Sequence, residues 1–281
     1  MNSAYVILNY HDETRVISLS NSIALLDPNS KIIIVNNNDI GDASFDESKF
    51  NSPTNIILLP SNGNIGYARG YNIGFRYALD YIKFDYLFSV NSDVIFSKDL
   101  IHKCERVLSC NKDIGLISSR MKTNGEETCC CWSLPTYKEY LKGNFFHFQK
   151  REPYFFPFST NCEFCHVDVV RASFFCITYN ALSKVKGYSK NVFLYDNENL
   201  LSVELLNAGY KEAVLTNFFY LHNHKTGKNN YKLLKYSWHD HLYYLKKHLK
   251  ISHFKSFLFT LTFFCYYSVI VVKNIMINRS T

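Results

Sequence analysis

Two neighbouring stretches of the chain decide the fold, SNGNIGYARGYNIGF at residues 61–75 and FSVNSDV at residues 88–94. The first is a glycine-rich turn that runs into a helix, and glycine lets a ligand approach the backbone closely. A helix that begins near Gly66 would offer free N–H groups and a positive dipole end to an anion. Arg69 would add a planar cation that suits phosphate oxygens. We therefore expect a phosphate-binding turn around Gly66, Arg69 and Gly70, although glycines that serve only helix packing would give the same spacing.

The second stretch ends a buried strand, predicted at residues 84–90, on an acidic turn. Open α/β sheets bind ligands outside the carboxyl ends of their strands. Mg²⁺ and Mn²⁺ prefer oxygen ligands and bridge to substrate phosphates. Asp93 is therefore a candidate metal ligand and Asn91 its polar partner. A turn that only closes the strand is the alternative.

Further motifs follow in order along residues 4–225. They are YVILNY at residues 5–10, IIIVNNN at residues 32–38, FLYDNE at residues 193–198 and LHNH at residues 221–224. Together with the two stretches above, they resemble family 2 glycosyltransferases of the GT-A fold, close to the rhamnosyltransferase and galactofuranosyltransferase branch. The resemblance implies a Rossmann-like sheet that binds a nucleotide-sugar donor. Its donor-binding residues would be Asn9, Asn36, Asn38, Gly66, Arg69, Gly70, Asn91 and Asp93.

Three positions depart from the family pattern. Asn36 stands where the family usually has the Asp that pairs with the pyrimidine base of the donor, and an amide can still donate and accept hydrogen bonds. Asn197 replaces the first carboxylate of an acidic pair, and Ser189 replaces an Asp. A non-catalytic, membrane-associated relative that binds a sugar nucleotide or a glycan is therefore an alternative to an enzyme.

Glu198 is the expected catalytic base. Inverting sugar transfer requires a base that takes the proton from the acceptor hydroxyl, and a carboxylate does so once a partly closed site raises its pKa. The departing nucleoside diphosphate must be stabilised as well, a role for Asp93 with Mg²⁺ or Mn²⁺. The alternative for Glu198 is a first-turn residue of the helix that begins near residue 197.

His222 and His224 alternate at the end of a predicted strand, so only one of them should point into the site. The resemblance favours His222 as a ligand of the metal or of the diphosphate. A structural histidine with satisfied hydrogen bonds is the alternative reading of His222.

Strand and helix signals alternate along the chain, which predicts an α/β fold with a mainly parallel sheet flanked by helices. The expected strands lie at residues 4–9, 31–36, 55–59, 84–90, 114–119, 165–178 and 213–221, and the expected helices at residues 12–26, 66–80, 98–109, 179–186 and 197–208. Residues 122–162 are less regular and contain three prolines. They predict a variable insertion beside the acceptor cleft.

The last fifth of the chain differs in charge from the rest. Residues 222–281 carry ten Lys or Arg and one Asp, whereas the preceding 221 residues carry 21 Lys or Arg and 23 Asp or Glu. Residues 256–272 hold no formal charge and are rich in Phe, Tyr, Leu and Val. Such a segment suits an anionic membrane surface, and a helix packed on the protein is the alternative. We expect a catalytic domain at residues 1–225 and a helical, membrane-associating tail at residues 226–281.

The predicted first strand starts almost at the first residue, so no signal peptide is expected and the nine cysteines should stay reduced. These observations predict a cytoplasmic protein that lies peripherally at the inner face of the plasma membrane. A homo-oligomer is compatible with the sequence, and nucleic acid is not an expected partner because no nucleic-acid module accompanies the basic charge.

The expected function is inverting, metal-dependent transfer of a sugar from dTDP-rhamnose or a UDP-sugar to a saccharide acceptor, lipid-linked if the tail binds membrane. By resemblance, the product would be a bacterial surface polysaccharide such as O-antigen or capsule. A metal-dependent nucleotidyltransferase is a second alternative, because it shares the α/β nucleotide site. It would release pyrophosphate rather than nucleoside diphosphate.

Overall fold

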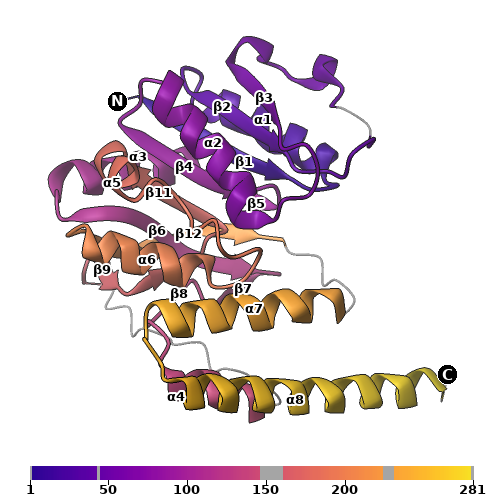
Figure 1. The fold of residues 1–281 in the computed structure, drawn as a ribbon. Coiled ribbons are helices and arrows are strands. Elements are labelled where there is room, and N and C mark those ends of the chain that lie inside the picture. The colour runs from indigo at the N-terminus through magenta and orange to yellow at the C-terminus, as the bar shows by residue number, and fades with distance from the viewer. Residues whose placement is uncertain (1, 43–44, 146–160, 224–230, 280–281) are drawn as a thin grey trace.

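The computed structural model describes residues 2–42, 45–145, 161–223 and 231–279, which form a mixed sheet with helices on both faces (Figure 1). The first elements alternate as predicted, and their ends differ from the prediction by a few residues. They are β1 (Ser3–Asn9), α1 (Glu13–Leu26), β2 (Lys31–Asn36), β3 (Ile56–Pro60), α2 (Tyr67–Tyr81) and β4 (Tyr86–Asn91), with 3₁₀ turns at Glu47–Lys49 and Pro53–Asn55 before β3.

The chain from residue 94 onward completes the sheet and adds the lower helices. Its strands are β5 (Val94–Ile95), β6 (Ile114–Thr123), β7 (Glu126–Thr128), β8 (Cys131–Trp132), β9 (Phe164–Val167), β10 (Val169–Val170), β11 (Phe174–Thr178) and β12 (Lys211–His222). Its helices are α3 (Lys98–Cys110), α4 (Tyr137–Phe145), α5 (Tyr179–Val185), α6 (Asn197–Asn207), α7 (Tyr231–Lys247) and α8 (His253–Arg279).

The main sheet has the strand order β3-β2-β1-β4-β11-β6-β12-β5. Its first four strands are parallel, as the sequence predicts. β11 then runs antiparallel to both β4 and β6, while β12 is parallel to β6. The α/β fold is confirmed, and the sheet is parallel in its N-terminal half and mixed beyond β4.

β1 lies near the middle of the sheet and is apolar on both faces. Val6 and Tyr5 are fully buried and point to opposite faces, because side chains alternate along a strand. Val6 contacts α2 at Gly74, and the Tyr5 hydroxyl donates to Asp27 just beyond α1 at 3.2 Å. α1 and α2 therefore cover opposite faces of the sheet.

The single strand predicted at residues 165–178 is wrong, because this segment forms three short strands. β9 pairs with β12, β10 pairs with β8 in a separate two-stranded sheet, and β11 inserts between β4 and β6. Asp168 and Arg171 interrupt the apolar run at the two changes of direction. An apolar run by itself does not distinguish one strand from several.

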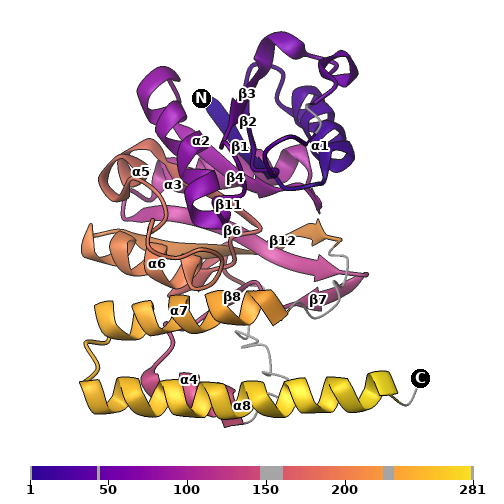
Figure 2. The ribbon, with the colours of Figure 1, turned by 45° about the vertical axis from the view of Figure 1, so that its right-hand side comes forward.

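α4, α7 and α8 form a helical layer below α6 in both views (Figures 1 and 2). The Asn144 Nδ2 of α4 donates to Thr262 Oγ1 of α8 at 3.0 Å, and the Trp238 Nε1 of α7 donates to Thr260 Oγ1 of α8 at 3.3 Å. The predicted insertion thus contributes a helix that packs on the tail. The predicted boundary at residue 225 lies outside the described residues.

Candidate active site

An amide cluster lies where β1 and β2 end. The Asn9 Nδ2 donates to Asn36 Oδ1 at 2.9 Å, to Asn38 Oδ1 at 3.1 Å and to Glu13 Oε1 at 2.9 Å. Asn9 and Asn38 are buried, whereas Asn36 is partly exposed. The structure thus brings together the three amides that the sequence predicts as donor-binding residues, and Asn36 is the one that a ligand can reach.

Glu13 fixes the orientation of two of these amides. Burial raises the pKa of the Glu13 carboxyl, but hydrogen bonds from Asn9 and Asn38 outweigh burial and lower the pKa below its usual value. The carboxylate is therefore ionised at neutral pH and holds both Nδ2 groups toward itself. The Asp12 N–H donates to the Asn9 Oδ1 at 3.1 Å, and the His11 N–H donates to the Asn38 Oδ1 at 2.7 Å.

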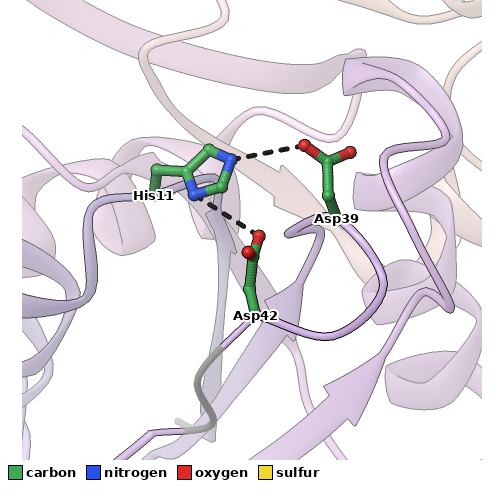
Figure 3. Close-up of side chains that lie close together, drawn as sticks. All are labelled: His11, Asp39 and Asp42. Carbon is green, nitrogen blue, oxygen red and sulfur yellow. Dashed lines mark ion pairs between the residues drawn. The ribbon is translucent and has the colours of Figure 1, made fainter.

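His11 also lies between two exposed carboxylates beside this cluster (Figure 3). Its Nε2 is 3.6 Å from Asp39 Oδ2, and its Nδ1 is 3.6 Å from Asp42 Oδ2. Among the described residues, these three side chains are the one group of three His, Cys, Asp or Glu close enough to hold a metal ion. Exposed carboxylates pair with a surface histidine without any ion, so we assign the group no role in the reaction.

The turn after β4 is held by hydroxyl groups from two directions. Tyr67 and Tyr71 of α2 donate to Asn91 Oδ1 at 3.1 and 3.0 Å, and Ser92 Oγ donates to Asp12 Oδ2 at 2.7 Å. Burial raises the pKa of both tyrosines, so their hydroxyls remain donors at neutral pH. Asn91 therefore anchors the turn, and its contact with a donor stays a prediction.

Asp93 and His222 meet at the end of this turn. β5 pairs antiparallel with the end of β12, and this register places His222 opposite Val94. The His222 Nε2 lies 3.1 Å from Asp93 Oδ1, and both side chains are largely buried. Adjacent ligand atoms around an octahedral ion are about 3 Å apart when each lies about 2.1 Å from the ion. The predicted pair therefore fits one edge of a Mg²⁺ or Mn²⁺ shell. His224 lies outside the described residues.

The glycine turn meets the loop that leads to Glu198. Gly66 has φ +92° and precedes the first residue of α2, whose Tyr67 N–H donates to Phe193 O at 2.8 Å. A Cβ at Gly66 would lie 2.6 Å from Phe193 Cδ2. Glycine is required here by both its conformation and this close approach, whatever its part in phosphate binding.

Gly70 and Arg69 also have protein partners. A Cβ at Gly70 would lie 2.5 Å from Leu8 Cδ1, so this glycine lets α2 pack closely on β1. The Arg69 side chain is exposed, and its Nε donates to Lys190 O at 2.8 Å. Phosphate binding by Gly66, Arg69 and Gly70 stays a prediction.

Glu198 lies in the first turn of α6, partly exposed. Its Oε1 accepts the Ala172 N–H at 3.4 Å. Burial raises the pKa of the Glu198 carboxyl, and the nearby Arg171 charge opposes part of that rise. A carboxylate with a raised pKa suits a general base.

A chain of hydrogen bonds links Glu198 to the acidic turn. Ala172 donates its N–H to Glu198, and its carbonyl oxygen accepts the Tyr67 hydroxyl at 3.2 Å. The same hydroxyl contacts Asn91, two residues before Asp93. The structure therefore connects Glu198 to the turn that carries Asp93, and their roles as base and metal ligand stay predictions.

Sequence reasoning missed four residues that organise this site: Asp12, Glu13, Tyr67 and Arg171. Asp12 and Glu13 are the N-cap and the first residue of α1, and their position shortly after the polar end of β1 could have shown that they face the same site. Tyr67 and Arg171 act through contacts with distant segments, which no local pattern reveals.

Two solved structures share this fold at low sequence identity. One is the crystal structure of GalNAc-T7 with UDP, GalNAc and Mn²⁺, with a TM-score of 0.60 and 11% identity over 88% of this chain and 50% of that chain. The other is the mannosyltransferase PcManGT from Pyrobaculum calidifontis with GDP-Man and Mn²⁺, with a TM-score of 0.57 and 10% identity over 96% of this chain and 75% of that chain. This chain therefore spans half the length of the first structure.

Sequence comparison identifies the family directly. No curated protein sequence matches the chain. The family model described as glycosyl transferase family 2 matches residues 6–174, a segment that includes the amide cluster, the glycine turn and Asp93. Because the match covers more than half of the sequence, the chain belongs to glycosyl transferase family 2.

Proposed function

We propose that this chain transfers a sugar, with inversion, from a nucleotide-diphosphate donor to a hydroxyl of a saccharide acceptor. The observation that carries the proposal is the contact of Asp93 with His222 in the turn after β4. A chain of hydrogen bonds links Asn91 of that turn to Glu198, a carboxylate whose pKa is raised. The two related structures were solved with UDP or GDP-Man together with Mn²⁺, which supports a nucleotide donor and a divalent metal.

Each part of the site takes one role in the proposed reaction. Asn36 contacts the donor base from the amide cluster, and Asp93 and His222 hold Mg²⁺ or Mn²⁺. When bound, the metal offsets the charge that develops on the departing diphosphate. Glu198 takes the proton from the acceptor hydroxyl as the hydroxyl oxygen attacks the anomeric carbon. The donor is dTDP-rhamnose or a UDP-sugar, as the family resemblance implies.

We further propose that the acceptor is lipid-linked and that the protein works at an anionic membrane surface, in the synthesis of a surface polysaccharide. Support comes from four exposed apolar side chains at helical spacing along α8, the last of which, Phe264, also has its ring centroid 5.7 Å from that of Trp238 of α7. Their exposed fractions are 73% for Phe254, 64% for Phe257, 48% for Leu261 and 47% for Phe264. Among the described residues, no helix is long and apolar enough to cross a bilayer.

The test is a thermal-shift panel of UDP, dTDP, GDP and CDP, each with and without Mn²⁺. We expect one nucleotide to raise the Tm in a metal-dependent manner, because binding to the folded state stabilises it. Asp93→Ala should abolish the Mn²⁺ dependence, and the exposed Asp80→Ala on α2 is the matched control. If no nucleotide raises the Tm, the proposed transferase is wrong. Release of pyrophosphate from a nucleotide substrate would instead identify a nucleotidyltransferase.

A further inference from the structure

The turn that leads to Glu198 is built around a buried carboxylate from α7. Asp240 is fully buried, and its Oδ2 accepts backbone N–H groups from Phe193 at 3.1 Å, Leu194 at 2.9 Å and Tyr195 at 2.9 Å. Three successive N–H groups that converge on one anion form a concave anion site. Here the anion is a side chain of the same protein, and the hydrogen bonds are charge-assisted.

His241, which follows Asp240 in α7, contacts Asp196, which follows Tyr195 in the turn. The His241 Nδ1 lies 2.5 Å from Asp196 Oδ2, and Tyr140 of α4 donates its hydroxyl to Asp196 Oδ1 at 2.5 Å. Asp196 has φ +56° and caps no backbone N–H of α6, although its Oδ1 also accepts the Asn199 Nδ2 of α6 at 2.6 Å. The residue immediately before α6 is therefore held by α4 and α7 as well as by α6 itself.

Phe193 joins the same turn to the glycine segment. Its ring stacks on Tyr236 of α7 with centroids 4.0 Å apart, and its carbonyl oxygen accepts the Tyr67 N–H at the start of α2. The turn is thus held between α7 on one side and the start of α2 on the other. Glu198 follows Tyr195 by three residues, in the first turn of the helix that this turn leads into.

We propose that Asp240 is a positioning residue that sets the location of Glu198 from the C-terminal part of the chain. The inference rests on the proposed role of Glu198 as the base. Loss of the Asp240 carboxylate leaves buried N–H groups without an acceptor, which is costly, so the turn rearranges to reach water or other acceptors. A displacement of about 1 Å at a reacting group can lower a rate about 100-fold.

The experiment compares Asp240→Ala with Asp240→Asn in the full chain. Turnover is measured as release of nucleoside diphosphate from a sugar donor that carries the nucleotide selected by the thermal-shift panel. For Asp240→Ala we expect kcat to fall at least tenfold, while the donor KM stays within about twofold because the amide cluster is untouched. Asp240→Asn should recover part of kcat, because its Oδ1 can replace one carboxylate oxygen as an acceptor.

Glu105→Ala is the matched control, because Glu105 is also a buried carboxylate and accepts a hydrogen bond from Ser3 at the opposite end of β1 from Asn9. Hydrogen exchange of the amides at residues 193–198 is measured in parallel. We expect faster exchange in Asp240→Ala and unchanged exchange in Glu105→Ala. The proposal is overturned if Asp240→Ala keeps wild-type kcat, loses no more kcat than Glu105→Ala, or leaves the exchange of these amides unchanged.

Glu198→Gln separates this inference from the proposed function. If Glu198→Gln turns over normally, Glu198 is not the base and the proposed mechanism is wrong. In that case, the exchange of the amides at residues 193–198 still decides whether Asp240 holds the turn. If Glu198→Gln is inactive and Asp240→Ala is fully active, Glu198 is retained as the base and the proposed positioning role of Asp240 is wrong.

Discussion

At the scale of single residues, the Glu198 carboxylate lies where burial raises its pKa, beside the Ala172 N–H and the Arg171 charge. A base acts only when ionised. We therefore expect kcat/KM to fall on the acid side as Glu198 takes up a proton, and this fall should occur above the usual Glu pKa of about 4.3. In Glu198→Gln we expect turnover to drop about 100-fold or more, with nucleotide binding retained.

The measurement is a pH–rate profile of donor turnover for wild type and for Glu198→Gln, with nucleotide affinity determined by calorimetry. In Glu198→Gln the fall of kcat/KM on the acid side, which is the acid limb of the profile, should disappear together with most of the activity. Loss of nucleotide affinity in Glu198→Gln would mean that the carboxylate belongs to the donor site, and an unchanged acid limb would assign that limb to another group.

At the scale of elements, α2 lies close to β1 because Gly70 faces Leu8. We expect Gly70→Ala to lower the free energy of unfolding by about 1–3 kcal/mol, because a methyl group 2.5 Å from Leu8 Cδ1 overpacks the contact. Arg76→Ala, on an exposed position of the same helix, is the control. Urea unfolding measures both variants, and a Gly70→Ala variant as stable as wild type would contradict the packing role.

Local sequence patterns predict the N-terminal half of the sheet and the polar residues at the ends of its strands. The alternation of β1, α1, β2, β3, α2 and β4 follows from the spacing of apolar residues, and Asn9, Asn36 and Asp93 could be placed because polar residues end those strands. The division of residues 164–178 among three pairings depends on β12, β8 and β4, which lie far away in the sequence. For the same reason, the contacts of Tyr67, Asp240 and His241 could not be predicted.

At the scale of the whole molecule, α8 lies in the helical layer below α6 (Figure 2), and it carries the exposed apolar stripe of Phe254, Phe257, Leu261 and Phe264. We expect the protein to co-sediment with vesicles that contain anionic phosphatidylglycerol, and binding to weaken as salt rises. Phe254→Ser with Phe257→Ser should reduce binding, because these side chains carry the largest exposed fractions of the stripe.

Leu25→Ser is the matched control, since Leu25 is a 75% exposed apolar residue on α1. Vesicles of neutral phosphatidylcholine test the electrostatic part of the interaction. Equal binding of the double variant and of Leu25→Ser would show that α8 does not contact the membrane. A concentration-dependent shift of the vesicle-free protein to a larger species would instead assign the stripe to contacts between copies.

Asp240 lies 45 residues after Tyr195, whose N–H is the last of the three backbone amides that the Asp240 carboxylate accepts. During translation, the strands that carry Asn9, Asn36 and Asp93 leave the ribosome before the segment that sets Glu198 has its partner. At about 5–20 residues per second, the interval between the synthesis of Tyr195 and that of Asp240 lasts a few seconds. For this interval the turn before Glu198 would have no carboxylate to accept its amides, so a nascent chain would acquire its proposed base in working position only after α7 has been made.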